Sequence, residues 1–227
     1  MDLNGHYQQL YTKSSQAILA GNYSLDPQIN DSSDSRFGIT LLIRPCQTVK
    51  NQIQLFLEKL KAIDPAQYYY PDSDIHITVM SIISCYEGFN LDKISVENYI
   101  EIIRKCILDL GEIKIKFRGV TASTSAIMIQ GFPTSGSLNN LREKLRENFK
   151  KSNLEQSIDS RYAIATAHST VMRFQEELQN PEKLMTVTEN FRNYNFGEFT
   201  VEKIELVCND WYQRERNTVT ICDFYLR

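Results

Sequence analysis

A repeated pentapeptide divides this chain of 227 residues into two halves of similar pattern. The residues from His76 read His-Ile-Thr-Val-Met and those from His168 read His-Ser-Thr-Val-Met, so that only the second position differs. The copies lie 92 positions apart, and adding 92 to positions 37, 96, 113 and 125 again leads from one predicted helix or strand to another of the same type. An internal duplication therefore constrains the fold, because two copies of one unit are expected to form two similar lobes.

Hydrophobic periodicity places helices between strands along both halves of the chain. Alternating apolar residues predict strands, and apolar residues three or four positions apart predict helices. Strands are predicted at 37–44, 74–83, 113–117, 125–130, around 168, at 199–207 and at 219–226, with helices at 49–60, 96–110, 138–149 and 184–194. We therefore expect an α+β fold with two lobes related by a pseudo-twofold axis. Two antiparallel or mixed sheets would be flanked by helices, with a central cleft between the lobes. A doubly wound nucleotide fold is disfavoured, because neither GxGxxG nor GxxxxGK[ST] occurs.

The first 35 residues precede the repeat. Apolar spacing predicts a helix at 7–20, and the stretch at 21–35, rich in Gly, Asn, Asp and Ser, predicts a loop. We expect residues 1–35 to form an appendage without catalytic residues, and residues 36–227 to form a single bilobal domain.

Composition and charge exclude several classes of protein. With 42% hydrophobic residues the chain can bury a substantial core, yet no stretch approaches the roughly 18 to 20 consecutive apolar residues of a membrane helix. The polar start is unlike a signal peptide, so we expect a cytoplasmic monomer without a membrane partner. A net charge of -3 argues against a protein that coats long nucleic acid, which needs clustered Lys and Arg. The five cysteines include no CxxC pair and predict packing thiols rather than zinc ligands.

Each pentapeptide places one imidazole and one hydroxyl on the same side of a strand. Residues i and i+2 of a strand share a face, so His76 lies beside Thr78 and His168 beside Thr170. If the lobes meet about their pseudo-twofold axis, the two imidazoles oppose each other across the cleft with the hydroxyls between them. Displacement at a phosphodiester needs a base on one side of phosphorus and an acid on the other. Histidine can serve as either near neutral pH, and the hydroxyls can donate to the non-bridging oxygens.

Paired His-x-Thr motifs half a chain apart resemble those of the two-histidine (2H) phosphoesterase superfamily. This superfamily includes the bacterial and archaeal 2'-5' RNA ligases, the plant cyclic phosphodiesterases and the nucleotide-binding domain of some kinase-anchoring proteins. The resemblance covers residues 37–227 and implies a bilobal fold, catalysis without a metal or other cofactor, and action on cyclic phosphates or 2'-5' linkages in nucleotides or at RNA ends. It implies that His76, Thr78, His168 and Thr170 are the catalytic residues.

Three further residues are candidates for substrate binding. Arg173 matches the RNA-ligase-like branch, which often has arginine five places after its second histidine. Strict alternation puts Arg173 on the face opposite His168, so it reaches the cleft only through a bulge or at the strand end; the alternative is a surface ion pair. Phe174 alternates onto the His168 face, where it could stack on a base or belong to the core of its lobe. Tyr70, the last of three consecutive tyrosines, could stack on a nucleobase at the cleft mouth or be buried.

Several functions remain open from the sequence. The first is a metal-independent phosphodiesterase that hydrolyses cyclic or 2'-5' phosphodiesters, or forms a cyclic phosphate by transesterification, with either histidine as acid or base. The second is a non-catalytic module of the same fold that binds a nucleotide. The third is hydrolysis of a cyclic oligonucleotide signal. The two imidazoles could also hold zinc, but neither an HExxH motif nor a cysteine pair supplies a third ligand.

Overall fold

The structure is a computed structural model that describes residues 2–226. Its helices are α1 (Leu3–Leu19), α2 (Gln47–Lys61), α3 (Val96–Ile107), α4 (Ser137–Lys151) and α5 (Pro181–Asn190), with short 3₁₀ turns at Pro27–Asn30, Leu91–Lys93 and Glu215–Asn217. Its strands are β1 (Arg36–Ile43), β2 (Tyr68–Tyr69), β3 (Ile77–Glu87), β4 (Lys114–Ser123), β5 (Ala126–Pro133), β6 (Ser169–Arg173), β7 (Asn195–Thr200), β8 (Lys203–Asp210) and β9 (Val219–Tyr225).

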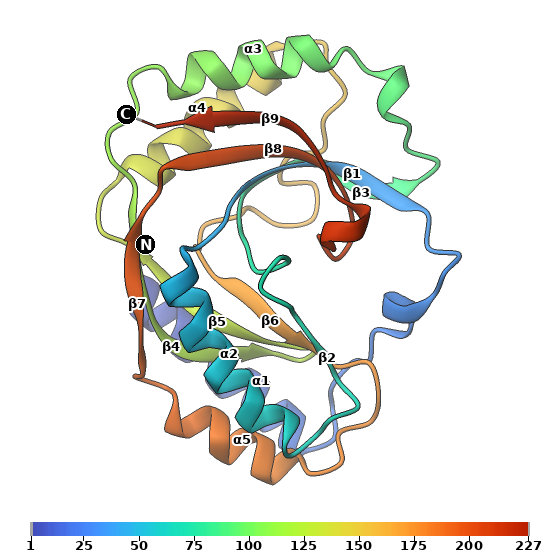
Figure 1. The fold of residues 1–227 in the computed structure, drawn as a ribbon, viewed down its shortest axis with the longest axis vertical. Coiled ribbons are helices and arrows are strands. Elements are labelled where there is room, and N and C mark those ends of the chain that lie inside the picture. Colours follow the sequence, from blue (N-terminus) through green and yellow to red (C-terminus); the bar gives the residue numbers. More distant parts are fainter. Residues whose placement is uncertain (1, 227) are drawn as a thin grey trace.

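The strands form two sheets in which every pairing is antiparallel. The first sheet has the order β3-β1-β8-β9 and the second has the order β2-β6-β5-β4-β7 (Figure 1). Apart from the short strand β2, the two orders correspond, with β3 equivalent to β6, β1 to β5, β8 to β4 and β9 to β7. β3 and β6 are the strands that follow His76 and His168. The predicted α+β fold of two related lobes, with antiparallel sheets and flanking helices, is therefore confirmed.

Helices cover the outer face of each sheet (Figure 1). α3 and α4 pack against each other and against the first sheet, whereas α1, α2 and α5 pack against the second. Two of these helices change sides. α2 follows β1 of the first sheet but packs on β6 and β7, and α4 follows β5 of the second sheet but packs on β3. This exchange ties the two lobes together.

The lobes do not coincide with the two halves of the sequence. Only Thr124 and Ser125 separate β4 from β5, so a tight hairpin keeps β4 in the second sheet although it belongs to the first half of the repeat. β8 and β9, from the second half, lie in the first sheet. Each half of the chain therefore supplies strands to both sheets, and neither half can form a complete lobe alone.

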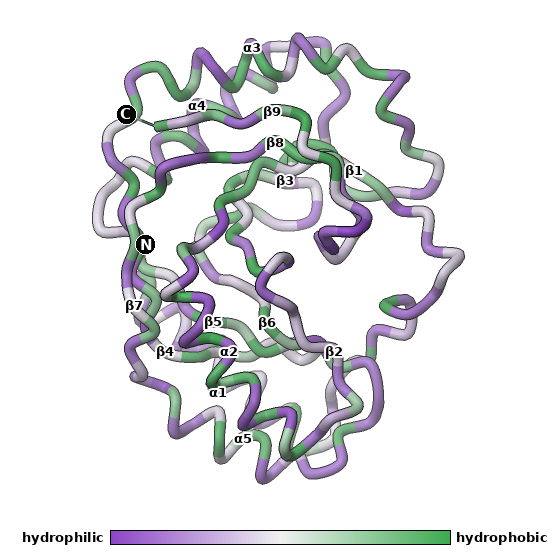
Figure 2. The backbone as a smooth tube through the Cα atoms, viewed as in Figure 1, coloured by the Kyte–Doolittle hydropathy of each residue, from purple (hydrophilic) through white to green (hydrophobic). Residues whose placement is uncertain are grey.

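The hydrophobic core follows the alternation of the strands. Apolar residues gather on the strands and on the inward sides of the helices (Figure 2). Ile77 and Val79 of β3 are fully buried, whereas Thr78 between them is partly exposed. Buried side chains from both sheets and from α1 to α5 form one connected hydrophobic cluster.

The N-terminal segment is packed into the second lobe rather than appended to it. α1 lies against β4 and α5, and Tyr7, Tyr11 and Ile18 on its inner side are buried. The Tyr7 hydroxyl donates to the Gly131 carbonyl and accepts from the Gly131 amide. Ile29, within the predicted loop, is also buried. The buried residues of α1 lie four and seven positions apart, which is the spacing of an amphipathic helix that covers a sheet.

We expect α1 to contribute directly to the stability of the protein. Ile18 is completely buried and its neighbour Leu19 is 50% exposed. Ile18→Ala should lower the free energy of unfolding by roughly 2–5 kcal/mol, because a buried side chain is lost, and Leu19→Ala should change it by less than about 0.5 kcal/mol. Urea unfolding of both variants measures the difference. Equal and small effects would mean that α1 is not docked on the sheet in solution.

Candidate active site

One cleft between the two sheets contains the four residues predicted to be catalytic. His76, Thr78, His168 and Thr170 all line it. Each histidine is the last residue before its strand, His76 before β3 and His168 before β6. Each threonine is the second residue of that strand, and both are partly exposed. The expected pairing of imidazole and hydroxyl is thus present in each lobe, and the two pairs meet in one cleft.

A β-bulge follows the threonine in both motifs and fixes the direction of the residues that come after it. In β6, Met128 pairs with Thr170 and Ile127 pairs with Met172, which leaves Val171 as an extra residue. In β3, Leu42 pairs with Thr78 and Leu41 with Met80, which leaves Val79 as the extra residue. With the bulge, two consecutive side chains, Val and Met, are buried in both strands. The repeated Thr-Val-Met sequence therefore has a structural reason.

The bulge brings Arg173 into the cleft. A bulge was one of the two ways in which Arg173 was predicted to reach it. Arg173 lines the cleft with Thr170, three positions earlier. Its Nε donates to the Tyr70 hydroxyl at 2.9 Å, and its Nη1 lies 3.7 Å from Asp26 Oδ2. The guanidinium is therefore held by a neutral phenol and by one long ionic contact, and its charge remains available to an anion in the cleft.

The interpretation of Phe174 as a stacking residue is wrong. Phe174 is completely buried and packs edge-on against Tyr23, with ring centroids 5.9 Å apart. Because the bulge at Val171 shifts the alternation by one residue, the core side that strict alternation assigned to Arg173 receives Phe174 instead. Phe174 therefore belongs to the core of the second lobe.

Tyr70 lines the cleft but does not lie at its mouth. Its side chain is only 2% exposed and its ring packs edge-on against Tyr68. Its hydroxyl accepts the hydrogen bond from Arg173. A buried ring in this position cannot offer a free face to a base, so the stacking prediction for Tyr70 is not met, and its observed contact orients Arg173.

Each imidazole is held through its Nδ1 atom. His76 Nδ1 lies 2.7 Å from the Asp74 carbonyl oxygen, and His168 Nδ1 lies 2.7 Å from Thr166 Oγ1. A carbonyl only accepts, so His76 carries its proton on Nδ1 and presents the Nε2 lone pair. The Thr166 hydroxyl can donate or accept, so it is compatible with either tautomer of His168 and with the protonated ring. The two histidines thus differ in the protonation states that their partners permit.

Both histidines are neutral at pH 7 in the free protein. Burial lowers the pKa of His76 to about 4, against the opposing hydrogen bond to Asp74. Burial also lowers the pKa of His168 to about 4, and the charge that His76 gains when it is protonated and the charge of Arg142 act in the same direction. An anion bound between the two rings would raise both pKa values, because it stabilises the charged form.

Arg142 is a site residue that the sequence interpretation missed. Arg142 is only 1% exposed, although it carries a charge. From α4 it donates to the carbonyls of Thr78 (2.9 Å), Val79 (3.0 Å) and Thr166 (2.8 Å). Within residues 2–226 no carboxylate pairs with it. Its position four residues after Leu138, on the apolar face of the helix, was the signal in the sequence.

Two further observations concern metals and membranes. Among residues 2–226 no group of three or more His, Cys, Asp or Glu side chains is arranged to hold a metal ion. In the same range no helix has the length and apolar character needed to cross a membrane.

The two half-buried histidines should make the protein less stable in acid. Their folded-state pKa values of about 4 lie below the ordinary value of 6.5. Between these values the unfolded chain binds more protons, so the free energy of unfolding falls as the pH drops from 6.5 to 4. Each histidine should account for roughly 3 kcal/mol of this loss.

Urea unfolding between pH 4.5 and 7.5 measures the effect. The double variant His76→Gln/His168→Gln should show a much weaker pH dependence of the free energy of unfolding than the wild type. If the stability of the double variant keeps the wild-type pH dependence, the two imidazoles are not held neutral by the folded protein.

Comparison with known proteins gives the family. Residues 37–217 match the family model for the AKAP7 2'5' RNA ligase-like domain. TT0787 of Thermus thermophilus is similar in structure with a TM-score of 0.58, at 14% identity over 85% of this chain and 98% of that chain. Escherichia coli LigT complexed with 3'-AMP gives a TM-score of 0.57, at 13% identity over 84% of this chain and 98% of that chain. At these identities the likeness concerns the fold, and no curated protein matches in sequence.

The family match covers both motifs and most of the chain, and the structural neighbours share the bilobal fold. The chain therefore belongs to the AKAP7 2'5' RNA ligase-like domain family, within the 2H phosphoesterase superfamily.

Proposed function

We propose that this protein is a phosphodiesterase that acts without a metal ion, as a monomer, on cyclic phosphates or 2'-5' linkages in nucleotides or at RNA ends. The observation that carries the proposal is the pair of imidazoles in one cleft, each held at Nδ1 and each accompanied by a threonine. This arrangement leaves both Nε2 atoms to act on opposite sides of one phosphate. General acid–base catalysis of an in-line displacement needs that geometry.

The partners of the two rings suggest their roles. His76 presents a lone pair at Nε2, so it is suited to accept the proton of an attacking water. As the oxygen of water bonds to phosphorus, the bond to the leaving ribose oxygen breaks. His168, whose Thr166 partner tolerates the protonated ring, gives its Nε2 proton to that oxygen. If a neighbouring ribose hydroxyl attacks in place of water, the same two transfers produce a cyclic phosphate.

Three more residues can stabilise the negative charge that develops on the phosphate oxygens in the transition state. The hydroxyls of Thr78 and Thr170 can donate to the non-bridging oxygens, where negative charge accumulates. Arg173 adds a positive charge in the same cleft, held in place by Tyr70. The nucleotide substrate is supported by relatives of the same fold, since Escherichia coli LigT forms complexes with 3'-AMP, ATP and NADP+.

Loss of either histidine should abolish most of the activity. We expect His76→Ala and His168→Ala each to lower kcat by about 10² to 10⁴-fold, the usual contribution of a general acid or base. Thr170→Ala should lower it by about 10² to 10³-fold. His6→Ala is the matched control and should be unaffected, because His6 is exposed on α1.

The measurement is hydrolysis of 2',3'-cyclic nucleotides, 2'-5' and 3'-5' dinucleotides and cyclic dinucleotides, all with EDTA present. Turnover that EDTA leaves intact and that needs both histidines supports the proposal. Nucleotide binding without turnover of any compound would replace it with the non-catalytic binding module.

The two kinetic parameters should differ in their pH optimum. The active form needs one protonated and one neutral imidazole, and both pKa values are about 4 in the free protein. kcat/KM reports the free enzyme, so it should decline above about pH 5. kcat reports the complex, in which the bound phosphate raises the histidine pKa, so its optimum should lie at higher pH. The substrate cannot cause this difference, because a phosphodiester does not titrate in this range. The same pH optimum for kcat and kcat/KM would contradict this account.

A further inference from the structure

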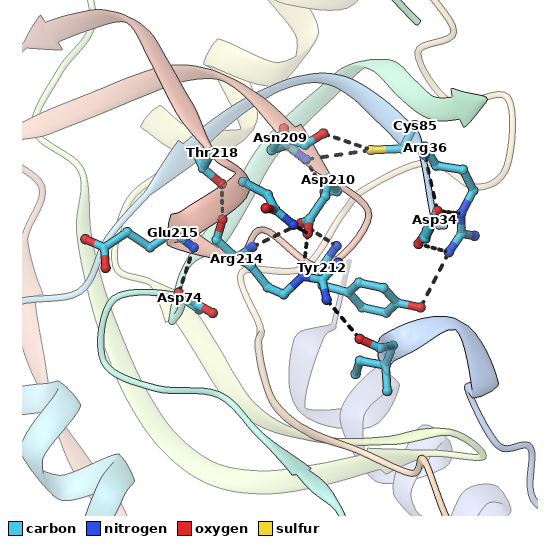
Figure 3. A network of polar contacts seen from close by, with 12 residues as sticks. Asp34, Arg36, Asp74, Cys85, Asn209, Asp210, Tyr212, Arg214, Glu215 and Thr218 are labelled. Carbon is cyan, nitrogen blue, oxygen red and sulfur yellow. Dashed lines mark hydrogen bonds and ion pairs between the residues drawn. The ribbon is translucent and has the colours of Figure 1, made fainter. Parts of the chain in front are cut away.

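The loop between β8 and β9 is built around one buried carboxylate. Asp210 accepts hydrogen bonds from the backbone amides of Tyr212 and Arg214, both at 3.0 Å, and from Arg214 Nε at 2.5 Å. Asn217 Nδ2 adds a fourth bond at 2.8 Å. Figure 3 shows Asp210 at the centre of this network, with Arg214 and Tyr212 beside it. A carboxylate with this many partners holds the loop in one conformation.

Gln213 lies inside that rigid loop in a conformation that costs free energy. Its φ is 62°, in the left-handed region that residues other than glycine rarely adopt. The backbone bonds of Tyr212 and Arg214 to Asp210 on either side keep it there. Strain of this kind persists where the surrounding structure imposes it, and it is often found at ligand-binding sites.

The Gln213 side chain lines the cleft without a partner. It is 6% exposed, and within residues 2–226 no group makes a hydrogen bond with its buried Oε1. A buried carboxamide without partners is unfavourable unless something binds it. The neighbouring Asn209, 1% exposed and also in the cleft wall, has an Oδ1 atom in the same situation. Two unsatisfied carboxamide oxygens therefore lie in the wall of one cleft.

An aromatic ring lies between these two residues in the sequence. Trp211 lines the cleft, and the guanidinium groups of Arg161 and Arg36 lie over its ring at 4.1 Å and 4.9 Å from the centroid. Arg161 is exposed and has no carboxylate partner within the described chain. An indole face that already holds a planar cation is suited to hold a planar base in its place.

We propose that Gln213 and Trp211 form a nucleobase-recognition subsite, in which the Gln213 carboxamide hydrogen-bonds the edge of the base and Trp211 stacks on its face. The inference rests on the proposed function, because it assumes that the cleft receives a nucleotide. A carboxamide has an acceptor oxygen beside an NH2 group that donates. The oxygen can accept from an amine or ring N–H of a base while the NH2 group donates to the adjacent ring nitrogen or carbonyl. The left-handed backbone is then the means of aiming this side chain at the base.

The test compares binding of the 3'-mononucleotides of adenine, guanine, cytosine and uracil with binding of ribose 3-phosphate, which has no base. Isothermal titration calorimetry gives each Kd for the wild type and for Gln213→Ala. We expect the preferred nucleotide to bind the variant about tenfold more weakly, the loss of one or two hydrogen bonds. Ribose 3-phosphate should bind both proteins alike. Trp211→Ala should weaken all four nucleotides by about tenfold or more, without regard to base.

Gln213→Gly is a second variant without the carboxamide, included in case Gln213→Ala does not fold. Glycine accepts the left-handed conformation without strain, so its Tm should not fall below that of the wild type. It lacks the carboxamide just as alanine does, and its Kd values should match those of Gln213→Ala. If both variants keep the wild-type order of the four nucleotides, or weaken ribose 3-phosphate as much as the nucleotides, the inference is overturned.

Failure of the inference and failure of the proposed function give different results. Hydrolysis that depends on His76 and His168, with no effect of Gln213 on base preference, would leave the proposed function standing without this subsite. Base-selective binding that depends on Gln213, with no hydrolysis, would leave the subsite standing in a protein that binds nucleotides without cleaving them.

Discussion

Arg142 makes the contact on which the geometry of the cleft depends. It reaches from α4 to Thr78 and Val79 at the start of β3 and to Thr166 before β6, so one guanidinium holds the backbone of both motifs. These are the two segments that must stay at a constant separation for two imidazoles to act on one phosphate. A cation buried in this way without a carboxylate is costly by itself.

The duplication supplies more than two copies of a histidine. Both copies carry a bulge at the valine of the motif, and in both the next residue but one turns toward the cleft, Ser81 in the first lobe and Arg173 in the second. The scaffold is therefore nearly symmetric while the groups that it presents are not. The partners of the two imidazoles differ in the same way, a carbonyl for His76 and a hydroxyl for His168. In the proposed mechanism, this asymmetry is the reason that one ring begins as base and the other as acid.

Residues outside the repeat complete the site. Tyr7 of α1 hydrogen-bonds Gly131, whose backbone lies so close to the Ala167 carbonyl that a side chain at position 131 would collide with it. Asp26 and Ile29 bind the side chains of Tyr212 and Arg214, on either side of Gln213. The N-terminal segment thus supports the cleft from two directions, although none of residues 2–35 lines it.

The sequence by itself determined the α+β class and the positions of the two repeated motifs, because strand alternation and a repeat of 92 positions can be read directly from the order of the residues. Tertiary structure decided the rest. A bulge at Val171 exchanged the places of Arg173 and Phe174, since register depends on the partner strand and not on the strand's own residues. Arg142 gained its role from carbonyls of distant segments. Asp210 and Gln213 gained theirs from the conformation of the loop that contains them, in which the Arg214 amide binds Asp210 and Gln213 is left-handed. Periodicity predicts the face of a residue only while the strand stays regular, and pairing and packing decide where the register shifts and which groups a side chain contacts.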